Sequence, residues 1–303
     1  MIYKKRTKSK ELRILEILNQ RMDLDTNAKK HYLNLKKGYE GELIFDGLTE
    51  KLQCECLILN DLLFEMNNTL FQIDSLIILQ KKIYFFEVKH NEGDHKYESG
   101  NFYKLPNYLI SNPLDQLSRS DTLLRQLLSK LKYNLPIEPN VVFINQKFTL
   151  YQAPLDQPII YPTQVRNYLS NLNATPSRLT NRHRELAEKL VSLHIVESPY
   201  DKLPEYEYGD LRKGIVCLKC ESFLEDIEGK IKYTTCKNCG SIELTDNAIL
   251  RTINDFKLLF PNEKLTTKTI FEWCKVVKSE RKIRNILLKY YKKSGEHRWS
   301  YYE

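Results

Sequence analysis

The sequence contains no long apolar run. No apolar stretch in its 303 residues approaches the roughly 18 residues that a membrane span needs, so no membrane association is expected. The N-terminal stretch MIYKKRTKSKELR is basic and lacks the apolar segment of a signal peptide, which predicts a soluble, cytoplasmic protein. Hydrophobic residues nevertheless make up 42 % of the chain, and its length suffices for two or three domains with proper cores.

Acidic residues are the minority among the charged ones, and the formal net charge is +8. Residues 248–303 alone carry 13 Lys and Arg against 6 Asp and Glu, so most of the excess lies near the C-terminus. A second basic patch lies near the N-terminus and consists of Lys4, Lys5, Arg6, Lys8, Lys10 and Arg13. Local positive charge of this kind suits DNA or RNA, although a solvated Lys-rich surface has the same composition.

Cysteines are few, and an intracellular setting argues against disulfides. Cys54, Cys56 and Cys274 lie in apolar contexts and are expected to be buried thiols. The other four form two Cys-x-x-Cys pairs that are separated by 15 residues, namely Cys217, Cys220, Cys236 and Cys239.

Two matched Cys-x-x-Cys pairs supply the tetrahedral set of four thiolates that Zn²⁺ accepts. The 15 residues between them contain a Gly turn flanked by strand-like residues, as a zinc ribbon requires. We therefore predict a structural Zn²⁺ whose binding is coupled to folding, because so small a segment has little core of its own. A redox dithiol is the competing interpretation, but it does not need two matched pairs. A catalytic zinc is not expected, because no coordination position is left open.

The stretch 71–90, FQIDSLIILQKKIYFFEVKH, predicts two strands joined by a turn at residues 80–82. Residues 83–88 are almost continuously apolar, as in a strand buried on both faces. Glu87 and Lys89 lie two residues apart and therefore point to the same side, and Asp74 comes from the neighbouring strand. The pattern predicts that the three side chains converge at an edge of the sheet. The alternative is a surface hairpin that carries three common charged residues.

Two carboxylates and a lysine in this arrangement have a definite chemistry. Asp74 and Glu87 can hold Mg²⁺ or Mn²⁺ through oxygen ligands. Such an ion lowers the pKa of a bound water and offsets the charge that develops on a phosphate under attack. A lysine such as Lys89 can orient the water or stabilise the transition state.

Near the C-terminus, residues 265–275 and 279–292 predict two helices joined by a short turn. Thr266 or Thr267 and Ser279 are the expected N-caps. Two helices of this kind fit a helix-turn-helix, and the tail after residue 293 could add a wing. The residues expected to contact nucleic acid are Lys278, Arg281, Lys282, Arg284, Asn285, Lys289 and Arg298. A helical hairpin that only packs on the rest of the protein is the alternative.

Motifs in the first half of the chain resemble the NERD (nuclease-related domain) family, a branch of the restriction-endonuclease-like PD-(D/E)xK superfamily. The resemblance covers roughly residues 36–150. It rests, in chain order, on five motifs, namely GYEGE at 38–42, QID at 72–74, FEVK at 86–89, GNFY at 100–103 and NPLDQ at 112–116. The one departure is Ile73, which stands where the superfamily signature has Pro.

The resemblance implies an α/β fold with a restriction-endonuclease-like mixed sheet flanked by helices. It implies that Asp74 and Glu87 are metal ligands and that Lys89 is the catalytic lysine. It further implies that Glu42 completes the acidic cluster and that Gln116 faces the same pocket. The small zinc ribbon with its four cysteines and the helix-turn-helix-like domain follow it in the chain. The expected domains are a basic helical lead-in at 1–34, the NERD domain at 35–175, a helix and linker at 176–213, the ribbon at 214–245 and the basic domain at 246–303.

The leading hypothesis is a Mg²⁺- or Mn²⁺-dependent nuclease that acts on DNA, or less readily on RNA, with the ribbon and the basic helices holding the nucleic acid. A non-catalytic protein that uses the nuclease fold as a docking module is the alternative. In a third hypothesis the C-terminal part recruits a DNA-processing partner such as a helicase or topoisomerase. The oligomeric state stays open, with a homodimer as one arrangement because restriction-like folds often dimerise to cut both strands.

Overall fold

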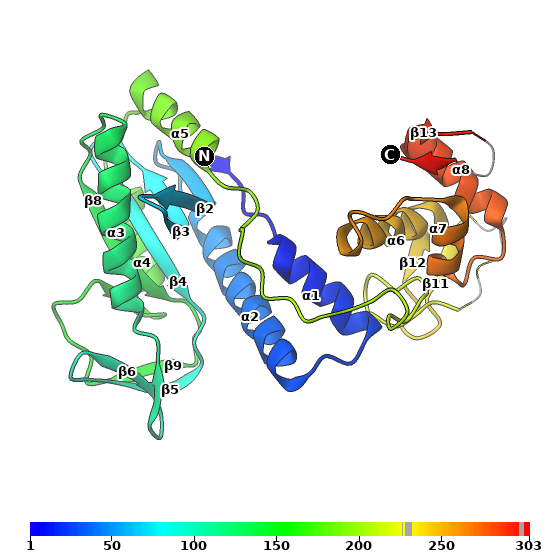
Figure 1. The fold of residues 1–303 in the computed structure, drawn as a ribbon. Coiled ribbons are helices and arrows are strands. Elements are labelled where there is room, and N and C mark those ends of the chain that lie inside the picture. Colours follow the sequence, from blue (N-terminus) through cyan, green and yellow to red (C-terminus); the bar gives the residue numbers. More distant parts are fainter. Residues whose placement is uncertain (226, 228–231, 297–299) are drawn as a thin grey trace. The chain divides into compact units, whose positions relative to one another are not determined.

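The computed structural model describes residues 1–225, 227, 232–296 and 300–303 (Figure 1). Its contacts divide the chain into two compact units. Unit 1 consists of Met1–Ser9 and Leu33–Asp201, and unit 2 consists of Lys10–Tyr32 and Lys202–Glu303. None of the described helices is long and apolar enough to cross a membrane.

Unit 1 is built on a mixed six-stranded sheet in the order β1-β2-β3-β4-β8-β10. Strands β2, β3 and β4 form an antiparallel meander, whereas β1, β8 and β10 pair with their neighbours in parallel. The strands are β1 (Ile2–Lys4), β2 (Leu57–Met66), β3 (Thr69–Ile78), β4 (Ile83–Lys89), β8 (Ile137–Phe143) and β10 (Ile159–Ile160). The predicted mixed α/β fold is confirmed.

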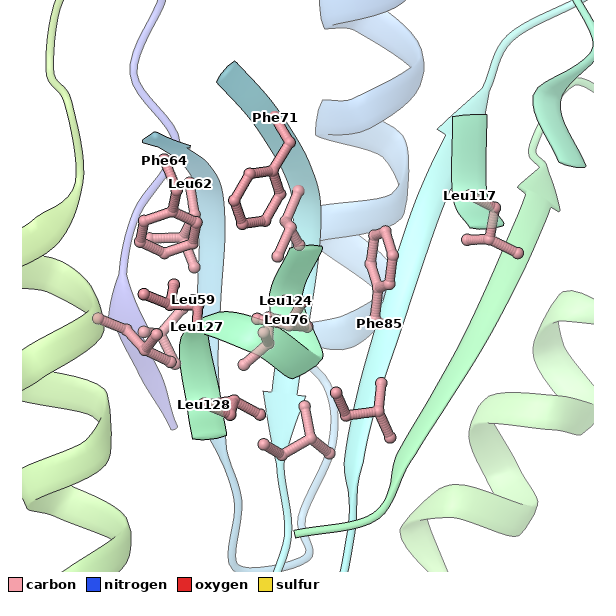
Figure 2. Close-up of a cluster of buried hydrophobic side chains, with 14 of the residues drawn as sticks. Leu59, Leu62, Phe64, Phe71, Leu76, Phe85, Leu117, Leu124, Leu127 and Leu128 are labelled. Atoms are coloured by element: carbon pink, nitrogen blue, oxygen red, sulfur yellow. The ribbon is translucent and has the colours of Figure 1, made fainter. Parts of the chain in front are cut away.

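Helices cover both faces of this sheet, which explains the apolar runs in its central strands. The helices of unit 1 are α2 (Thr26–Thr49, from Leu33 on), α3 (Pro113–Lys130), α4 (Val165–Asn173) and α5 (Asn181–Leu193). On one face, Leu76 and Phe85 pack with Leu124 of α3, as Figure 2 shows. On the other face, Phe86 packs with Phe45 of α2. Phe85 and Phe86 are consecutive, so β4 is buried on both faces, as predicted.

A second sheet lies beside the first within unit 1. Its strand order is β7-β6-β5-β9. The strands are β5 (Gly93–Glu98), β6 (Asn101–Lys104), β7 (Tyr108–Ile110) and β9 (Phe148–Tyr151). The polar stretch 91–111 therefore forms three antiparallel strands. Phe143 at the end of β8 stacks on Phe148 with 3.8 Å between ring centroids, which ties the two sheets together.

Two segments differ from the expected domain organisation. Residues 1–34 are not a purely helical lead-in, because β1 pairs with β2 and α1 (Lys10–Arg21) buries its apolar residues in the core of unit 2. The expected bridging helix after residue 176 is α5, and it packs on the sheet of unit 1 through Leu186, Ala187 and Leu190. In both cases the helix is charged on one side and packs its apolar side into a hydrophobic core.

Unit 2 combines α1 with the cysteine-rich segment and the C-terminal helices. Its elements are α1, β11 (Tyr233–Thr235), β12 (Ile242–Leu244), α6 (Thr245–Leu259), α7 (Thr267–Cys274), α8 (Glu280–Tyr290), β13 (Lys293–Ser294) and β14 (Tyr301–Tyr302). Trp273 lies fully buried at the centre, and the Arg21 guanidinium of α1 lies 4.2 Å from the centroid of its ring. The sequence reasoning predicts α7 and α8 but misses α6.

Candidate active site

All five residues expected at a catalytic centre line one cavity of unit 1. The cavity has a volume of about 430 Å³ and is lined by Glu42, Asp74, Glu87, Lys89 and Gln116, among others. Glu42 comes from α2, Gln116 from the first turn of α3, and the other three from β3 and β4. Strands β3 and β4 are the two middle strands of the sheet, and the site lies at the C-terminal end of β4, beside the middle of β3. The three side chains expected to converge, Asp74, Glu87 and Lys89, thus lie together on central strands and not on an outer strand of the sheet.

Backbone pairing fixes the position of Asp74 relative to β4. In the antiparallel register of β3 and β4, Ser75 lies opposite Phe86, which places Asp74 next to the C-terminal end of β4. The Asp74 carboxylate accepts a hydrogen bond from the backbone N–H of Val88, with 2.7 Å between Oδ2 and N. Asp74 is 6 % exposed and Glu87 is 1 % exposed. The two carboxylates thus lie at the bottom of the cavity, held by the sheet itself.

Lys89 joins the strand residues to α3. Its ammonium lies 2.7 Å from Glu87 Oε1 and donates a hydrogen bond of 2.9 Å to Gln116 Oε1. The Asn112 side chain caps α3 by accepting from the N–H of Leu114, and Pro113 occupies the first turn. The Asn-Pro-x-x-Gln motif therefore starts the helix at the point that brings Gln116 to the lysine.

One carboxylate oxygen in this cavity has no hydrogen-bond partner among the described residues. Within the part of the chain that the structure describes, Glu87 Oε2 is buried and accepts no hydrogen bond. A buried carboxylate oxygen without a donor is costly unless a cation binds it. Because this oxygen belongs to a residue that lines a cavity with two further carboxylates, the arrangement fits a divalent cation.

The pKa values of the cavity residues also fit a site for a divalent cation. Burial and the nearby Asp74 carboxylate raise the pKa of Glu87 to about 8. The same two causes raise the pKa of Glu42 to about 8, and burial raises the pKa of Asp74. Burial alone would lower the pKa of Lys89, but Glu87 and Asp74 outweigh it, so the pKa is raised and the side chain is a cation at neutral pH. Three carboxylates crowd here around one ammonium group.

A glycine allows α2 to reach this site. A Cβ atom on Gly41 would lie 2.5 Å from Cβ of His90, which follows β4 directly, so no larger residue fits without movement. The His90 ring also contacts the Lys37 carbonyl oxygen, at 2.9 Å from Nδ1. The close approach places Glu42, the next residue of α2, at the wall of the cavity. In the Gly-x-x-Gly-Glu motif the second glycine is thus required by packing, and the glutamate after it lines the cavity.

Arg6 is the residue of this site that the sequence reasoning missed. It was assigned to the N-terminal basic patch, yet its side chain is 1 % exposed. Its guanidinium lies 2.6 Å from Glu42 Oε2 and forms two bonds with the Asp46 carboxylate, at 2.9 and 3.0 Å. It also donates to the carbonyl oxygen of Asp74, at 2.7 Å. No local signal distinguishes Arg6 from the exposed cations around it, because its partners lie 36 or more residues away.

The family comparison supports the resemblance for this part of the chain. Residues 37–144 match the family model named NERD, nuclease-related domain. We call residues 37–144 the NERD segment. The NERD segment contains all five cavity residues named above, whereas Arg6 precedes it. The comparisons with curated proteins and with solved structures gave no significant match.

Unit 2 contains a second candidate site, formed by the four paired cysteines. The sulfur atoms of Cys217, Cys220, Cys236 and Cys239 all lie within 4.8 Å of one another. Sulfur atoms from opposite pairs are 3.7 Å (Cys217 and Cys239) and 3.6 Å (Cys220 and Cys236) apart. Zn–S bonds of about 2.3 Å in a tetrahedron place the sulfurs roughly 3.8 Å apart. The four cysteines therefore fit a metal such as zinc.

The two cysteine pairs have the same local geometry. Each is followed by a residue in the left-handed region, Glu221 with φ of 59° and Gly240 with φ of 70°, and then by a serine. The Ser222 hydroxyl contacts Cys220 Sγ at 3.0 Å, and the Ser241 hydroxyl makes the equivalent contact with Cys239 Sγ at 3.3 Å. Hydrogen bonds from Ser222 lower the pKa of Cys220 to about 5, which favours the metal-binding thiolate. The predicted Gly turn between the pairs lies outside the described residues.

The C-terminal helices place the residues that were expected to bind nucleic acid. Thr266 and Ser279 cap α7 and α8, as predicted, and the hairpin of β13 and β14 follows α8. The helix α8 buries Ile283, Ile286 and Leu287 and exposes the opposite side. A groove of about 1420 Å³ is lined by Arg281, Arg284 and Asn285, among others, and Lys289 lines a second cavity beside it.

The other three residues expected to contact nucleic acid are Lys278, Lys282 and Arg298, and of these Lys282 lines the second cavity. Lys278 is exposed between α7 and α8. Lys282 lies only 3.0 Å from Asp246 Oδ1, and its side chain is 16 % exposed, so an ion pair already engages it. Arg298 lies outside the described residues.

Proposed function

We propose that this protein is a Mg²⁺- or Mn²⁺-dependent nuclease that hydrolyses phosphodiester bonds of DNA. The observation that carries the proposal is the buried Oε2 of Glu87, which has no hydrogen-bond partner in the described part of the chain and lies in a cavity that also holds Asp74 and Lys89. A carboxylate held in this way has a clear use as a cation ligand and little use as packing. The match to the nuclease-related domain family supports the same chemistry.

In this proposal each cavity residue has a role. Asp74 and Glu87 hold the cation, and Glu42 completes the acidic cluster from α2. When bound, the cation supplies a Lewis acid that activates water and offsets charge on the scissile phosphate. Lys89 lies between Glu87 and Gln116, where its ammonium can orient the attacking water or stabilise the charge that develops on the phosphate. Gln116 holds Lys89 in place through its amide oxygen.

Nucleic acid is held, in this proposal, by unit 2. The exposed side of α8 carries Arg281, Arg284, Asn285 and Lys289, and the β13–β14 hairpin borders the same groove through Lys293. A helix with a basic exposed side fits the major groove of duplex DNA. DNA is therefore the expected substrate and RNA the less favoured one. The four-cysteine site holds a structural Zn²⁺ that stabilises the ribbon.

Labelled DNA separates the proposal from a non-catalytic role. The protein is incubated with single-stranded, duplex and branched DNA and with RNA, in Mg²⁺ or Mn²⁺. Cleavage is expected to disappear with EDTA and to fall at least about 100-fold in Asp74→Asn and Lys89→Ala. The matched controls are Asp156→Asn and Lys130→Ala, which change exposed residues of unit 1 and are expected to cut normally. Binding without cleavage on every substrate would leave the nuclease fold as a docking module.

A further inference from the structure

Arg6 brings a fixed positive charge to the acidic cluster. Its guanidinium contacts the Glu42 carboxylate and the main-chain oxygen of Asp74, and both residues line the cavity. On its other side the bidentate bond to Asp46 anchors it. The short strand β1, which pairs with β2, leads directly into this position. Arg6 is thus a buried arginine that contacts two carboxylates and one main-chain oxygen beside a candidate metal site, unlike the exposed cations of the same basic patch.

A charge count shows what this arginine does to metal binding. Four carboxylates of the connected network, those of Glu42, Asp46, Asp74 and Glu87, carry four negative charges when ionised. Arg6 and Lys89 offset two of them, because both contact these carboxylates directly. The remaining charge is −2, which one divalent cation neutralises. A second divalent cation would leave the buried network with a charge of +2, and uncompensated buried charge is costly.

The position of Arg6 leads to the same result. One oxygen of Glu42, Oε2, is already bonded to the guanidinium at 2.6 Å. A second metal ion between Glu42 and Asp74 would compete with Arg6 for this oxygen. The arginine cannot give up its proton. If its side chain moved away, the Asp46 carboxylate would stay buried without its ion-pair partner, which is costly. The side of the cluster toward α2 is therefore occupied by a built-in cation.

We infer that Arg6 takes the place of a second metal ion, so that the cluster binds one divalent cation per chain. The inference rests on the proposed function, because it concerns the same site. Arg6 is a positioning residue: it fixes Glu42 and Asp74 and sets the charge that the metal meets. The four carboxylates and Lys89 lie within the NERD segment, but the arginine comes from the segment that precedes it.

The number of bound ions tests this directly. Zinc-loaded protein is titrated with Mn²⁺, and free Mn²⁺ is counted by electron paramagnetic resonance. Asp74→Ala serves as the blank for weak binding elsewhere. The wild-type protein is expected to bind one Mn²⁺ in excess of the blank. Two ions in the wild type would overturn the inference, whatever the variants do.

Three variants separate a charge role from a structural one. Arg6→Met frees Glu42, and the ratio of Mn²⁺ to protein is expected to rise from one to two. Arg6→Lys keeps the charge and is expected to stay at one, as is Lys5→Met, which removes the charge of the exposed neighbour. One ion in Arg6→Met would overturn the inference. If Arg6→Met does not fold, the count of one in the wild type together with a count of one in Arg6→Lys still supports it.

The cleavage assay distinguishes the two levels of the proposal. Cleavage by a protein that binds two Mn²⁺ rejects the role of Arg6 and leaves the nuclease intact. A protein that neither binds Mn²⁺ above the blank nor cuts any substrate rejects both.

Discussion

Glu87 is a single residue whose burial costs free energy and whose carboxylate is suited to bind a cation. Its carboxyl is 1 % exposed, one oxygen is paired with Lys89 and the other has no partner among the described residues. The raised pKa means that in the absence of metal the folded protein favours the protonated form near neutral pH. A cation changes that balance, because it binds the deprotonated form. The free-energy cost of burying the Glu87 carboxyl is thus offset when a cation binds it.

Cation binding is therefore expected to release protons. The pKa of Glu87 is raised to about 8, so at pH 7 this group is mainly protonated, and a cation that binds it must displace the proton. The affinity for Mg²⁺ is expected to rise between pH 6 and 9 and to level off above this pKa. Isothermal titration calorimetry in two buffers of different ionisation enthalpy measures the released protons.

Glu87→Gln provides the matched variant for this prediction. It removes one titrating group and one ligand at nearly the same volume, so both proton release and Mg²⁺ affinity are expected to fall. Asp156→Asn, an exposed change, is expected to leave both unchanged. Affinity that does not vary with pH in the wild type would show that the carboxylates are already ionised before the cation binds.

At the scale of the elements, the two cysteine pairs offer a comparison within one molecule. Gly240 and Glu221 occupy equivalent positions with left-handed φ, yet only one of them is a glycine. A residue with a Cβ in this region costs about 1–2 kcal/mol relative to glycine. A Cβ added at Gly240 meets no atom within 4 Å, so the cost there is conformational and not steric.

Opposite changes are expected at these two positions. Gly240→Ala is expected to weaken zinc binding by about fivefold, which corresponds to about 1 kcal/mol of conformational strain. Glu221→Gly is expected to be neutral or to strengthen binding. Competition with a chromophoric chelator measures both variants, and Lys219→Ala, an exposed change in the first pair, is the control. Equal zinc affinity in Gly240→Ala and the wild type would show that the turn can adopt another conformation.

The elements also show what the sequence could and could not predict. Strands β3 and β4, the cap of α3 and the cysteine pairs carry local signals, namely alternation, Asn-Pro and fixed spacing. The parallel pairing of β5 with β9 joins residues about 55 positions apart, such as Gly93 and Phe148, and leaves no such signal. The same holds for β1 with β2 and for Arg6. Contacts of this kind depend on tertiary packing, and local propensity does not encode them.

On the scale of the whole molecule, some of the Lys and Arg side chains are engaged by the protein itself and others are exposed to solvent. Of the N-terminal basic patch, Arg6 is buried, and Lys4 donates to the carbonyl oxygens of Asn60 and Asp61 at 2.8 and 2.6 Å. The formal charge of +8 therefore overstates the charge that a polyanion meets. On α8, by contrast, Arg281 and Arg284 are exposed. The local placement of cations, more than their total, is expected to decide where nucleic acid binds.

The salt dependence of DNA binding tests this distinction. Each phosphate contact adds roughly 0.9 to the slope of log K against log salt concentration for duplex DNA. Arg281→Ala and Arg284→Ala are each expected to lower the slope by about 1, because each removes an exposed cation from α8. Lys282→Ala is expected to change the slope less, since this side chain already pairs with Asp246 at 3.0 Å. Fluorescence anisotropy with labelled duplex DNA gives the slopes. All proteins are zinc-loaded and carry Asp74→Asn, and no Mg²⁺ or Mn²⁺ is added, so that the DNA is not cleaved.

Lys257→Ala is the control, because Lys257 is an exposed cation of the same unit but belongs to α6. Lys257→Ala removes one positive charge without changing α8. It therefore separates an effect of the net charge of unit 2 from the loss of a specific phosphate contact. A slope lowered equally in Lys257→Ala and Arg284→Ala would mean that unit 2 attracts DNA through its net charge. A slope lowered only in the α8 variants would identify α8 as the element that lies against the DNA backbone.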